Sequence, residues 1–183
     1  MMTTIELDNL LDKCIEFHGH LCMGQILGVR IAVKGIELVK PESNKDLIVF
    51  VENDRCIADA IMTVTDTRLG RRSLKFRDYG KMAGTFINTK TNCAYRVFVK
   101  MKQEQKTDDT DVRKYLYVND DEIVSWYPVS VPMHENELPG RPKRVVACIT
   151  CGEKIFDGKD IVINGESVCI PCNSGAYFVP VNN

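Results

Sequence analysis

The sequence predicts two structural units, a mixed helix-and-strand domain over residues 1–127 and a small cysteine-rich unit over residues 144–183. Three observations predict this division. The first hundred residues alternate between helical and strand-like apolar periodicity. Four of the seven prolines fall within residues 128–143, which indicates an extended, semi-rigid linker. Four of the eight cysteines form two closely spaced pairs near the C-terminus.

The first expected helix begins behind a capping box, in which Thr3 and Glu6 satisfy each other's backbone N–H groups. Its apolar residues recur at helical spacing, at Leu7, Leu10, Leu11 and Cys14. His18 continues this pattern and is therefore expected on the same inward-facing stripe of the helix. A histidine on that stripe is a candidate for a structural or functional contact inside the domain.

Two further helices are expected. Residues 24–40 form the second, which stops before Pro41. Its small residues recur every fourth position, so another element can approach closely at Gly24, Gly28 and Ala32. Asn53 or Asp54 is expected to cap the third helix. The buried face of that helix would carry Ile57, Ala60, Ile61 and Val64.

Strands are expected between and after these helices. The continuous apolar run over residues 47–51 is typical of a central strand that is buried on both faces. Residues 82–88 and 93–102 alternate as strands and are expected to pair as a hairpin across residues 89–92. Residues 108–118 read as a short amphipathic helix.

The overall charge excludes some classes of protein. The 183 residues include 24 Lys and Arg against 25 Asp and Glu, a formal net charge of −1. A near-neutral net charge argues against a protein whose main role is to cover DNA or anionic lipid. No apolar run approaches the roughly 18–20 residues of a membrane span, and the N-terminus lacks the pattern of a secretory signal. We therefore expect a cytoplasmic protein.

The two cysteine pairs near the C-terminus have the spacing of a zinc site. Cys148 and Cys151 are followed, after 17 residues, by Cys169 and Cys172. A hairpin through residues 161–168, with Asn164-Gly165 as its turn, would bring the second pair back to the first. Four thiolates fill the tetrahedral sphere of zinc, so we expect a structural site, which a unit this small needs in order to fold.

The charge of this unit indicates what it contacts. Residues 144–183 hold three basic against four acidic side chains, which is a poor surface for phosphates. We therefore expect a packing or protein-contact role. Buried or disulfide-paired cysteines without a metal are the alternative interpretation.

A second group of metal-ligand residue types lies near the N-terminus, where His18, His20 and Cys22 alternate around Gly19. Imidazole and thiolate together suit zinc or another transition metal of similar softness. Cys56 is predicted in the first turn of the third helix, where the helix dipole would favour its thiolate. The alternative is that these are hydrogen-bonded or packed core residues, which is our expectation for Cys14 and Cys93, while His134 is expected to be exposed.

A basic stretch follows the third expected helix. Its side chains could hold an anionic substrate, a phosphate-bearing cofactor or an acidic partner; the anion-binding candidates are Arg68, Arg71, Arg72 and Lys81. The alternative is an ordinary solvated face, which we rank higher.

Three blocks of sequence together resemble a known family. Residues 17–24 (FHGHLCMG) resemble the FHGHxCPG signature of the FmdE-like family, which takes its name from a component of formylmethanofuran dehydrogenase. Residues 51–61 (VENDRCIADAI) and 76–81 (FRDYGK) agree with it in order and spacing. The C-terminal cysteines match the auxiliary finger that many members have.

The resemblance implies a fold, a site and partners. The fold is an α+β core domain followed by a small four-cysteine zinc finger of treble-clef or zinc-ribbon type, in a homodimer. The implied site is a metal-holding cleft in the core, formed by His18, His20, Cys22 and Cys56. Members are linked to the molybdenum or tungsten enzyme that begins methanogenesis from carbon dioxide, as accessory components without its catalytic cofactor.

Two positions depart from the family pattern. Met23 stands where the family has proline, and Thr67 stands where many members have cysteine. The second change removes a thiol that could act as a ligand or as a redox partner of Cys56. Asp66 is the neighbouring residue that could supply an oxygen ligand instead.

Three hypotheses of function follow. The first is a zinc-binding accessory protein with a structural finger and a second, transition-metal site in the core, serving a redox enzyme and contacting its subunits. The second is a metal- or thiol-dependent enzyme acting on a small anionic substrate, with Cys56 or Cys22 as the catalytic thiol. The third is a nucleic-acid-binding regulator. We rank them in that order.

Overall fold

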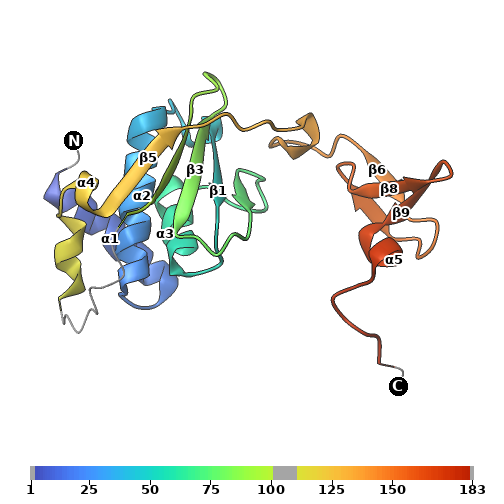
Figure 1. The fold of residues 1–183 in the computed structure, drawn as a ribbon, viewed down its shortest axis with the longest axis horizontal. Coiled ribbons are helices and arrows are strands. Elements are labelled where there is room, and N and C mark those ends of the chain that lie inside the picture. The colour runs from blue at the N-terminus through green and yellow to red at the C-terminus, as the bar shows by residue number, and fades with distance from the viewer. Residues whose placement is uncertain (1–2, 101–110, 182–183) are drawn as a thin grey trace. The chain divides into compact units, whose positions relative to one another are not determined.

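The N-terminal unit is a five-stranded mixed sheet with two helices against one of its faces and a third packed on those two helices (Figure 1). The computed structural model describes residues 3–100 and 111–181. The chain divides into two units, residues 1–131 and 132–183, each with its own fold. The expected combination of an α+β domain with a C-terminal four-cysteine unit is confirmed.

The strand order of the sheet is β2-β1-β3-β4-β5. β1 pairs with β2 in parallel, and the other neighbours pair antiparallel. On the central strand, Val49 lies between Leu74 of β2 and Phe86 of β3. The strand bounds are β1 (Leu47–Val51), β2 (Leu74–Phe76), β3 (Ala83–Asn88), β4 (Ala94–Val99) and β5 (Val124–Pro128).

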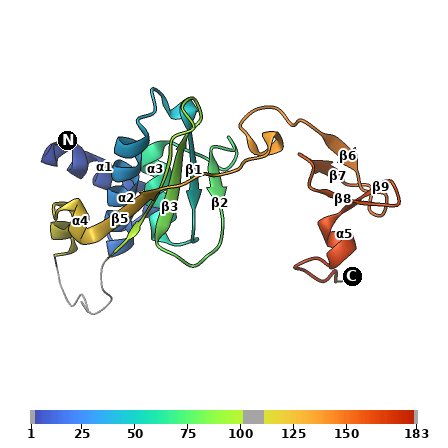
Figure 2. The same ribbon diagram turned by 45° about the horizontal axis from the view of Figure 1, so that its top comes forward.

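The three helices lie on the same side of the sheet, and the first of them packs on the other two (Figure 2). They are α1 (Thr4–His18), α2 (Met23–Val39) and α3 (Cys56–Thr65). The capping box of Thr3 and Glu6 is present at the start of α1, as predicted. The predicted cap of α3 is wrong, because Arg55 occupies the N-cap and no side chain caps that helix. α3 connects β1 to β2, since a parallel pair requires a crossover.

The remaining elements of this unit are short. β3 and β4 form the expected hairpin, each slightly shorter than predicted; residues 101–102 and 108–110 lie outside the described residues. Residues Val112–Leu116 form a 3-10 helix rather than the predicted amphipathic α-helix. Another 3-10 turn (Asn44–Asp46) precedes β1, and α4 (Asp120–Ile123) leads into β5.

A buried arginine attaches this last segment to α2. Arg30 donates to the carbonyl oxygens of Leu116 at 2.8 Å and Val118 at 2.5 Å. It also forms an ion pair with Asp120 at 2.6 Å. Because a buried guanidinium needs its donors satisfied, these bonds fix the 3-10 helix and α4 against the middle of α2.

The interior depends on glycines that let elements approach α2. A Cβ at Gly28 would lie 2.5 Å from the Cβ of Ala60 and 2.9 Å from the carbonyl oxygen of Ile57, both on α3. A Cβ at Gly35 would lie 2.3 Å from the ring of Phe86 on β3. Such separations are too short for any side chain, so the predicted close approach at the small residues of this helix is confirmed at Gly28.

The C-terminal unit consists of two short hairpins and a helix. β6 (Val145–Ala147) pairs with β7 (Lys154–Phe156), and β8 (Asp160–Ile163) pairs with β9 (Glu166–Cys169) across the expected Asn164-Gly165 turn. α5 (Ile170–Ser174) follows directly, and a 3-10 turn (Glu135–Glu137) precedes β6. The buried apolar cluster is small, comprising Cys148, Ile155 and Val168.

Among the residues that the structure describes, no helix combines the length and hydropathy that crossing a bilayer requires.

Changing Gly28 to alanine tests the close packing of α2 on α3. Helix propensity alone would stabilise the protein by about 1 kcal/mol. The overlap with Ala60 and Ile57 should instead lower the free energy of unfolding, by about 1–3 kcal/mol. Denaturant titration measures the change, with Gly70→Ala as control because nothing lies within 4 Å of a Cβ at Gly70. A more stable Gly28→Ala protein would contradict this account.

Candidate metal centres

The first candidate centre lies between the end of α1 and the start of α2. One ligand atom from each of His18, His20 and Cys22 can be chosen so that all three lie within 4.8 Å of one another. Gly19 permits this, because it ends α1 with a φ of 93°, a conformation that favours glycine. The turn brings the rings of His18 and His20 to a centroid separation of 4.6 Å. The convergence expected from the alternating pattern is therefore present.

His18 is oriented by an acidic residue on another helix. Its Nδ1 lies 2.8 Å from a carboxylate oxygen of Asp59 on α3, and its side chain is 14 % exposed. In the neutral tautomer that donates from Nδ1 to the Asp59 carboxylate, Nε2 presents its lone pair. Within the described part of the chain Nε2 is buried and has no hydrogen-bond partner. A histidine held in this way is prepared to bind a metal through Nε2.

Cys56 lies beside this group without being one of its three mutually close members. It is the first residue of α3, and its thiol neighbours the thiol of Cys22. The predicted thiolate is wrong for the metal-free protein, because burial, followed by the neighbouring Cys22 thiol, raises the pKa of Cys56. The helix start acts in the opposite direction and is outweighed.

One glycine, Gly24, and one glutamine, Gln25, pack against these cysteines. A Cβ at Gly24 would lie 2.8 Å from the Cβ of Cys56, and 3.6 Å and 3.7 Å from the Sγ atoms of Cys56 and Cys22. The absent side chain therefore leaves room for the Cβ of Cys56, while both sulfurs lie at ordinary contact distance from that point. Gln25, fully buried, donates from Nε2 to the carbonyl oxygen of Cys56 at 2.7 Å, while its Oε1 has no partner among the described residues.

The second candidate centre is in the C-terminal unit. The sulfur atoms of Cys148, Cys151, Cys169 and Cys172 all lie within 4.8 Å of one another. The first pair follows β6, Cys169 ends β9, and Cys172 lies on α5. The backbone N–H of Cys169 donates to the sulfur of Cys148 at 3.3 Å. The predicted quartet is thus assembled, and four thiols this close together can hold a metal ion.

The acidities of these four thiols show why a cation suits them. Backbone N–H groups of Cys169 and Cys151 lower the pKa of Cys148 to about 6. The thiol of Cys169, with burial and the other two thiols, raises the pKa of Cys172 to about 12. Without a cation, negative charge concentrates on one sulfur while another retains its proton. A divalent cation removes this repulsion and allows all four to ionise.

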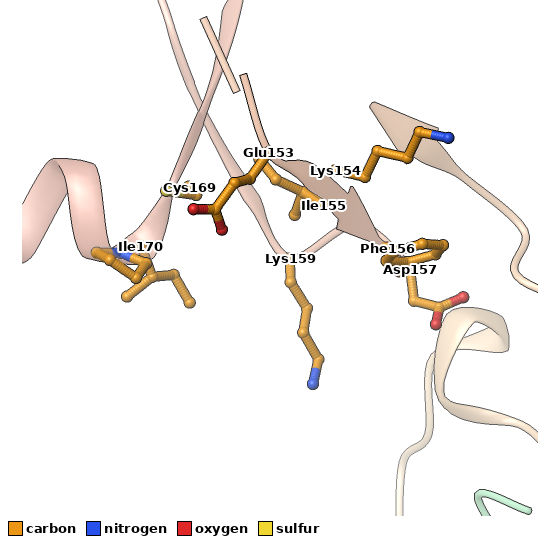
Figure 3. A pocket seen from close by; sticks show the side chains of 9 residues that line it. Glu153, Lys154, Ile155, Phe156, Asp157, Lys159, Cys169 and Ile170 are labelled. Carbon is orange, nitrogen blue, oxygen red and sulfur yellow. The ribbon is translucent and has the colours of Figure 1, made fainter. Parts of the chain in front are cut away.

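A hollow of about 330 Å³ lies on the surface of the same unit. Figure 3 shows Ile170 at one end and Phe156 at the other, with Glu153 and Lys159 between them. Both apolar side chains are about half exposed, and Cys169 lies in the wall. The hollow therefore lies against one member of the cysteine quartet, Cys169.

Three other residues from the sequence analysis occupy structural positions. Cys14 is fully buried, and burial raises the pKa of its thiol to about 12. Cys93 is partly buried against the main apolar cluster. His134 is exposed and caps the 3-10 turn that follows it, through Nδ1. All three agree with the non-functional interpretation.

The basic stretch satisfies much of its charge within the chain. Arg71 and Arg68 pair with Asp66 at 3.0 Å and 3.1 Å, and Arg68 also donates to the carbonyl oxygen of Met62 near the end of α3. Arg72 has a partner within the chain, and the side chain of Lys81 is exposed. Asp66 is therefore engaged by arginines and belongs to neither group of mutually close donors. Anion binding by this stretch stays a prediction.

Thr67 is fully buried at the position of the family cysteine. Its hydroxyl lies 2.7 Å from that of Thr65, which in turn donates to the carbonyl oxygen of Ile61. Threonine at this position therefore replaces a thiol with a hydroxyl group that is hydrogen-bonded to Thr65 at the end of α3.

Sequence reasoning did not assign Asp59 and Gln25 to the core centre. Asp59 lies 41 positions from His18, so no spacing rule connects them. The signal was indirect, because Asp59 is one helical turn after Cys56 and therefore lies on the same side of α3. Gln25 stands in the same relation to Cys22.

Comparison with known proteins agrees with this arrangement. A family described as "FmdE, Molybdenum formylmethanofuran dehydrogenase operon" matches residues 17–123, which include the core centre. A "Probable S-adenosyl-L-methionine-binding protein" of Archaeoglobus fulgidus is 34 % identical over 107 residues, 55 % of this chain. The chain spans only 29 % of the length of that curated relative.

A solved structure extends the likeness to nearly the whole chain. It is a tungsten formylmethanofuran dehydrogenase FmdE-like protein from Syntrophus aciditrophicus, with a TM-score of 0.66 and 18 % identity, covering 94 % of this chain and 95 % of the other. At that identity the likeness concerns the fold. The family match, which spans more than half of the sequence and includes the whole histidine–cysteine group, shows that the chain belongs to the FmdE family.

Proposed function

We propose that this protein is a metal-binding accessory protein with two centres of different kinds. The C-terminal cysteines hold a structural zinc ion in a treble-clef finger, and His18, His20 and Cys22 hold a second transition-metal ion in the core. The protein serves a molybdenum or tungsten redox enzyme, or related anaerobic metabolism. The observation that supports the core centre most strongly is the buried Nε2 of His18, which has no hydrogen-bond partner among the residues that the structure describes.

The free-energy cost of burying a polar atom without a hydrogen-bond partner explains why the Nε2 atom of His18 matters. A buried polar atom without a partner costs about 1–3 kcal/mol. The hydrogen bond from Nδ1 to Asp59 fixes both the ring and its tautomer, so His18 cannot turn Nε2 elsewhere without losing this bond. A metal ion bound by Nε2 satisfies the nitrogen, and the two neighbouring donors complete three protein ligands of the kind that zinc accepts.

The accessory role is supported by the family and by the chemistry of the site. The matched family is described by the operon of a molybdenum formylmethanofuran dehydrogenase, and the solved relative is described by the corresponding tungsten enzyme. A thiol-dependent enzyme has less support, since Cys56 favours the protonated thiol in the metal-free chain. A nucleic-acid regulator has less support because Arg144 of the finger is already paired with Asp160 at 2.6 Å.

We also propose that the protein is a homodimer that uses the finger for contact. The finger exposes large apolar side chains, including those at both ends of its hollow: Val145, Ile149, Phe156, Val162, Ile163 and Ile170. Sedimentation velocity across a range of concentrations should show a dimer that Phe156→Ser weakens. A monomer at every concentration would contradict the proposal.

Metal content tests the two centres together. Anaerobically purified protein should contain about two metal ions per chain, and Cys22→Ala about one. Cys93→Ala is the matched control and should keep both, because its thiol belongs to neither group. The variant with Cys148, Cys151, Cys169 and Cys172 all changed to serine should keep one. If Cys22→Ala and the parent hold equal amounts, the core centre is refuted.

Asp59 provides a test of the orientation of His18. Asp59→Asn removes the negative acceptor but keeps the shape, and second-sphere changes of this kind weaken metal binding by about 10- to 100-fold. Competition with a chromogenic chelator measures the affinity of the core ion. Glu16→Gln, an exposed carboxylate of α1, is the control and should leave the affinity unchanged. An unchanged affinity in Asp59→Asn would show that this contact does not prepare His18 for a metal.

A further inference from the structure

The thiols of Cys22 and Cys56 have a relationship that metal binding does not explain. Their sulfur atoms both lie beside Gly24, although only Cys22 belongs to the three mutually close donors. They are far apart in sequence and come together at the starts of two different helices, α2 and α3. The Cys22 sulfur therefore has two competing partners: a metal ion held with His18 and His20, and the thiol of Cys56.

The surroundings hold this pair together. Gly24 leaves open a point that lies 3.6 Å from one sulfur and 3.7 Å from the other. Gln25 holds the backbone of Cys56 through its carbonyl oxygen at 2.7 Å. Both cysteines are intermediate in exposure, so a small reagent can reach them, unlike the fully buried Cys14. A pair of adjacent, accessible thiols on fixed elements is suited to forming a disulfide.

We propose that Cys22 and Cys56 form a reversible disulfide, and that this disulfide and the core metal ion exclude each other. The proposal rests on the proposed function in one respect, the role of Cys22 as a metal ligand. A Cys22 sulfur bonded to Cys56 has no thiolate to offer, and two histidines alone hold an ion more weakly than two histidines and a thiolate. Oxidation thereby releases the metal, and reduction restores the site.

The reaction balances with a low-molecular-weight disulfide as oxidant. One cysteine thiolate attacks the reagent, forms a mixed disulfide and releases one reagent thiol. The second cysteine attacks the protein sulfur of that mixed disulfide, forms the Cys22–Cys56 bond and releases the second reagent thiol. Two protein thiols are oxidised, the reagent disulfide is reduced to two thiols, and the metal ion leaves as the free cation.

Treatment of the full-length, zinc-loaded protein with glutathione disulfide tests the proposal. We expect one equivalent of zinc to be released as a cross-link forms between the tryptic peptides 14–30 and 56–68. Cys14 shares a peptide with Cys22, so fragmentation of the cross-linked pair must place the bond at Cys22. Dithiothreitol followed by zinc should restore the original metal content.

Cys56→Ser is the decisive variant, because it keeps the three mutually close donors and the size of the side chain. With no second thiol at that position, release of the core zinc should slow by about tenfold or more, since the intramolecular step is lost. Cys93→Ser is the matched control and should release zinc as the parent does. Circular dichroism shows whether each variant has kept its fold.

The outcomes separate the two proposals. Equal rates of zinc release in the parent and Cys56→Ser, or no cross-link in the metal-free protein, overturn the disulfide. A cross-link that forms in a protein whose core holds no zinc from the start supports the dithiol and refutes the core metal instead. A cross-link that forms while the core zinc stays bound overturns the mutual exclusion.

Discussion

The close packing of α2 against α3 is the constraint on which the core centre depends. Gly28 brings the two helices into backbone contact, and Gly24, one turn earlier, extends that contact to the helix starts. As a result Cys22, which precedes α2, meets Cys56, which begins α3. The same approach brings Asp59 within hydrogen-bonding distance of His18. Larger residues at these two glycines would separate the helices and scatter the donors.

The two candidate centres differ in what a metal contributes to the protein. The finger buries only a small apolar cluster, so metal binding must supply much of its folding free energy. The N-terminal unit has two extensive apolar clusters, centred on Phe86 and on Leu11, and folds around them. The metal ion proposed for this unit could therefore leave without the domain unfolding. An ion that can leave is suited to exchange or chemistry rather than to structural support.

The sequence predicted those features that depend on nearby residues. The capping box of α1, the buried strand β1, the β3–β4 hairpin and the cysteine quartet all follow from short-range patterns. The cap of α3 was mispredicted because Asn53, one of the two expected caps, is buried and accepts from the backbone of Arg55 before the helix begins.

Long-range features were not accessible in the same way. The contact between His18 and Asp59 joins residues from two helices whose approach is set by tertiary packing. The acidity of Cys56 was mispredicted for a related reason: the helix start was visible in the sequence, while the burial and the adjacent thiol that outweigh it were not. Spacing identifies which residues can be ligands, but only packing determines what surrounds them.

The position of Cys56 determines what kind of centre the core can be. If its sulfur completed the coordination sphere, two histidines and two thiolates would close the site, as in structural zinc sites. Its place outside the three mutually close donors favours an ion with three protein ligands and one open position. An open position accepts a ligand from outside the chain, and the Cys56 thiol, beside that of Cys22, lies at the edge of the site. The proposed core centre would therefore be open to exchange, in contrast to the four-cysteine centre, whose ligands would close the sphere.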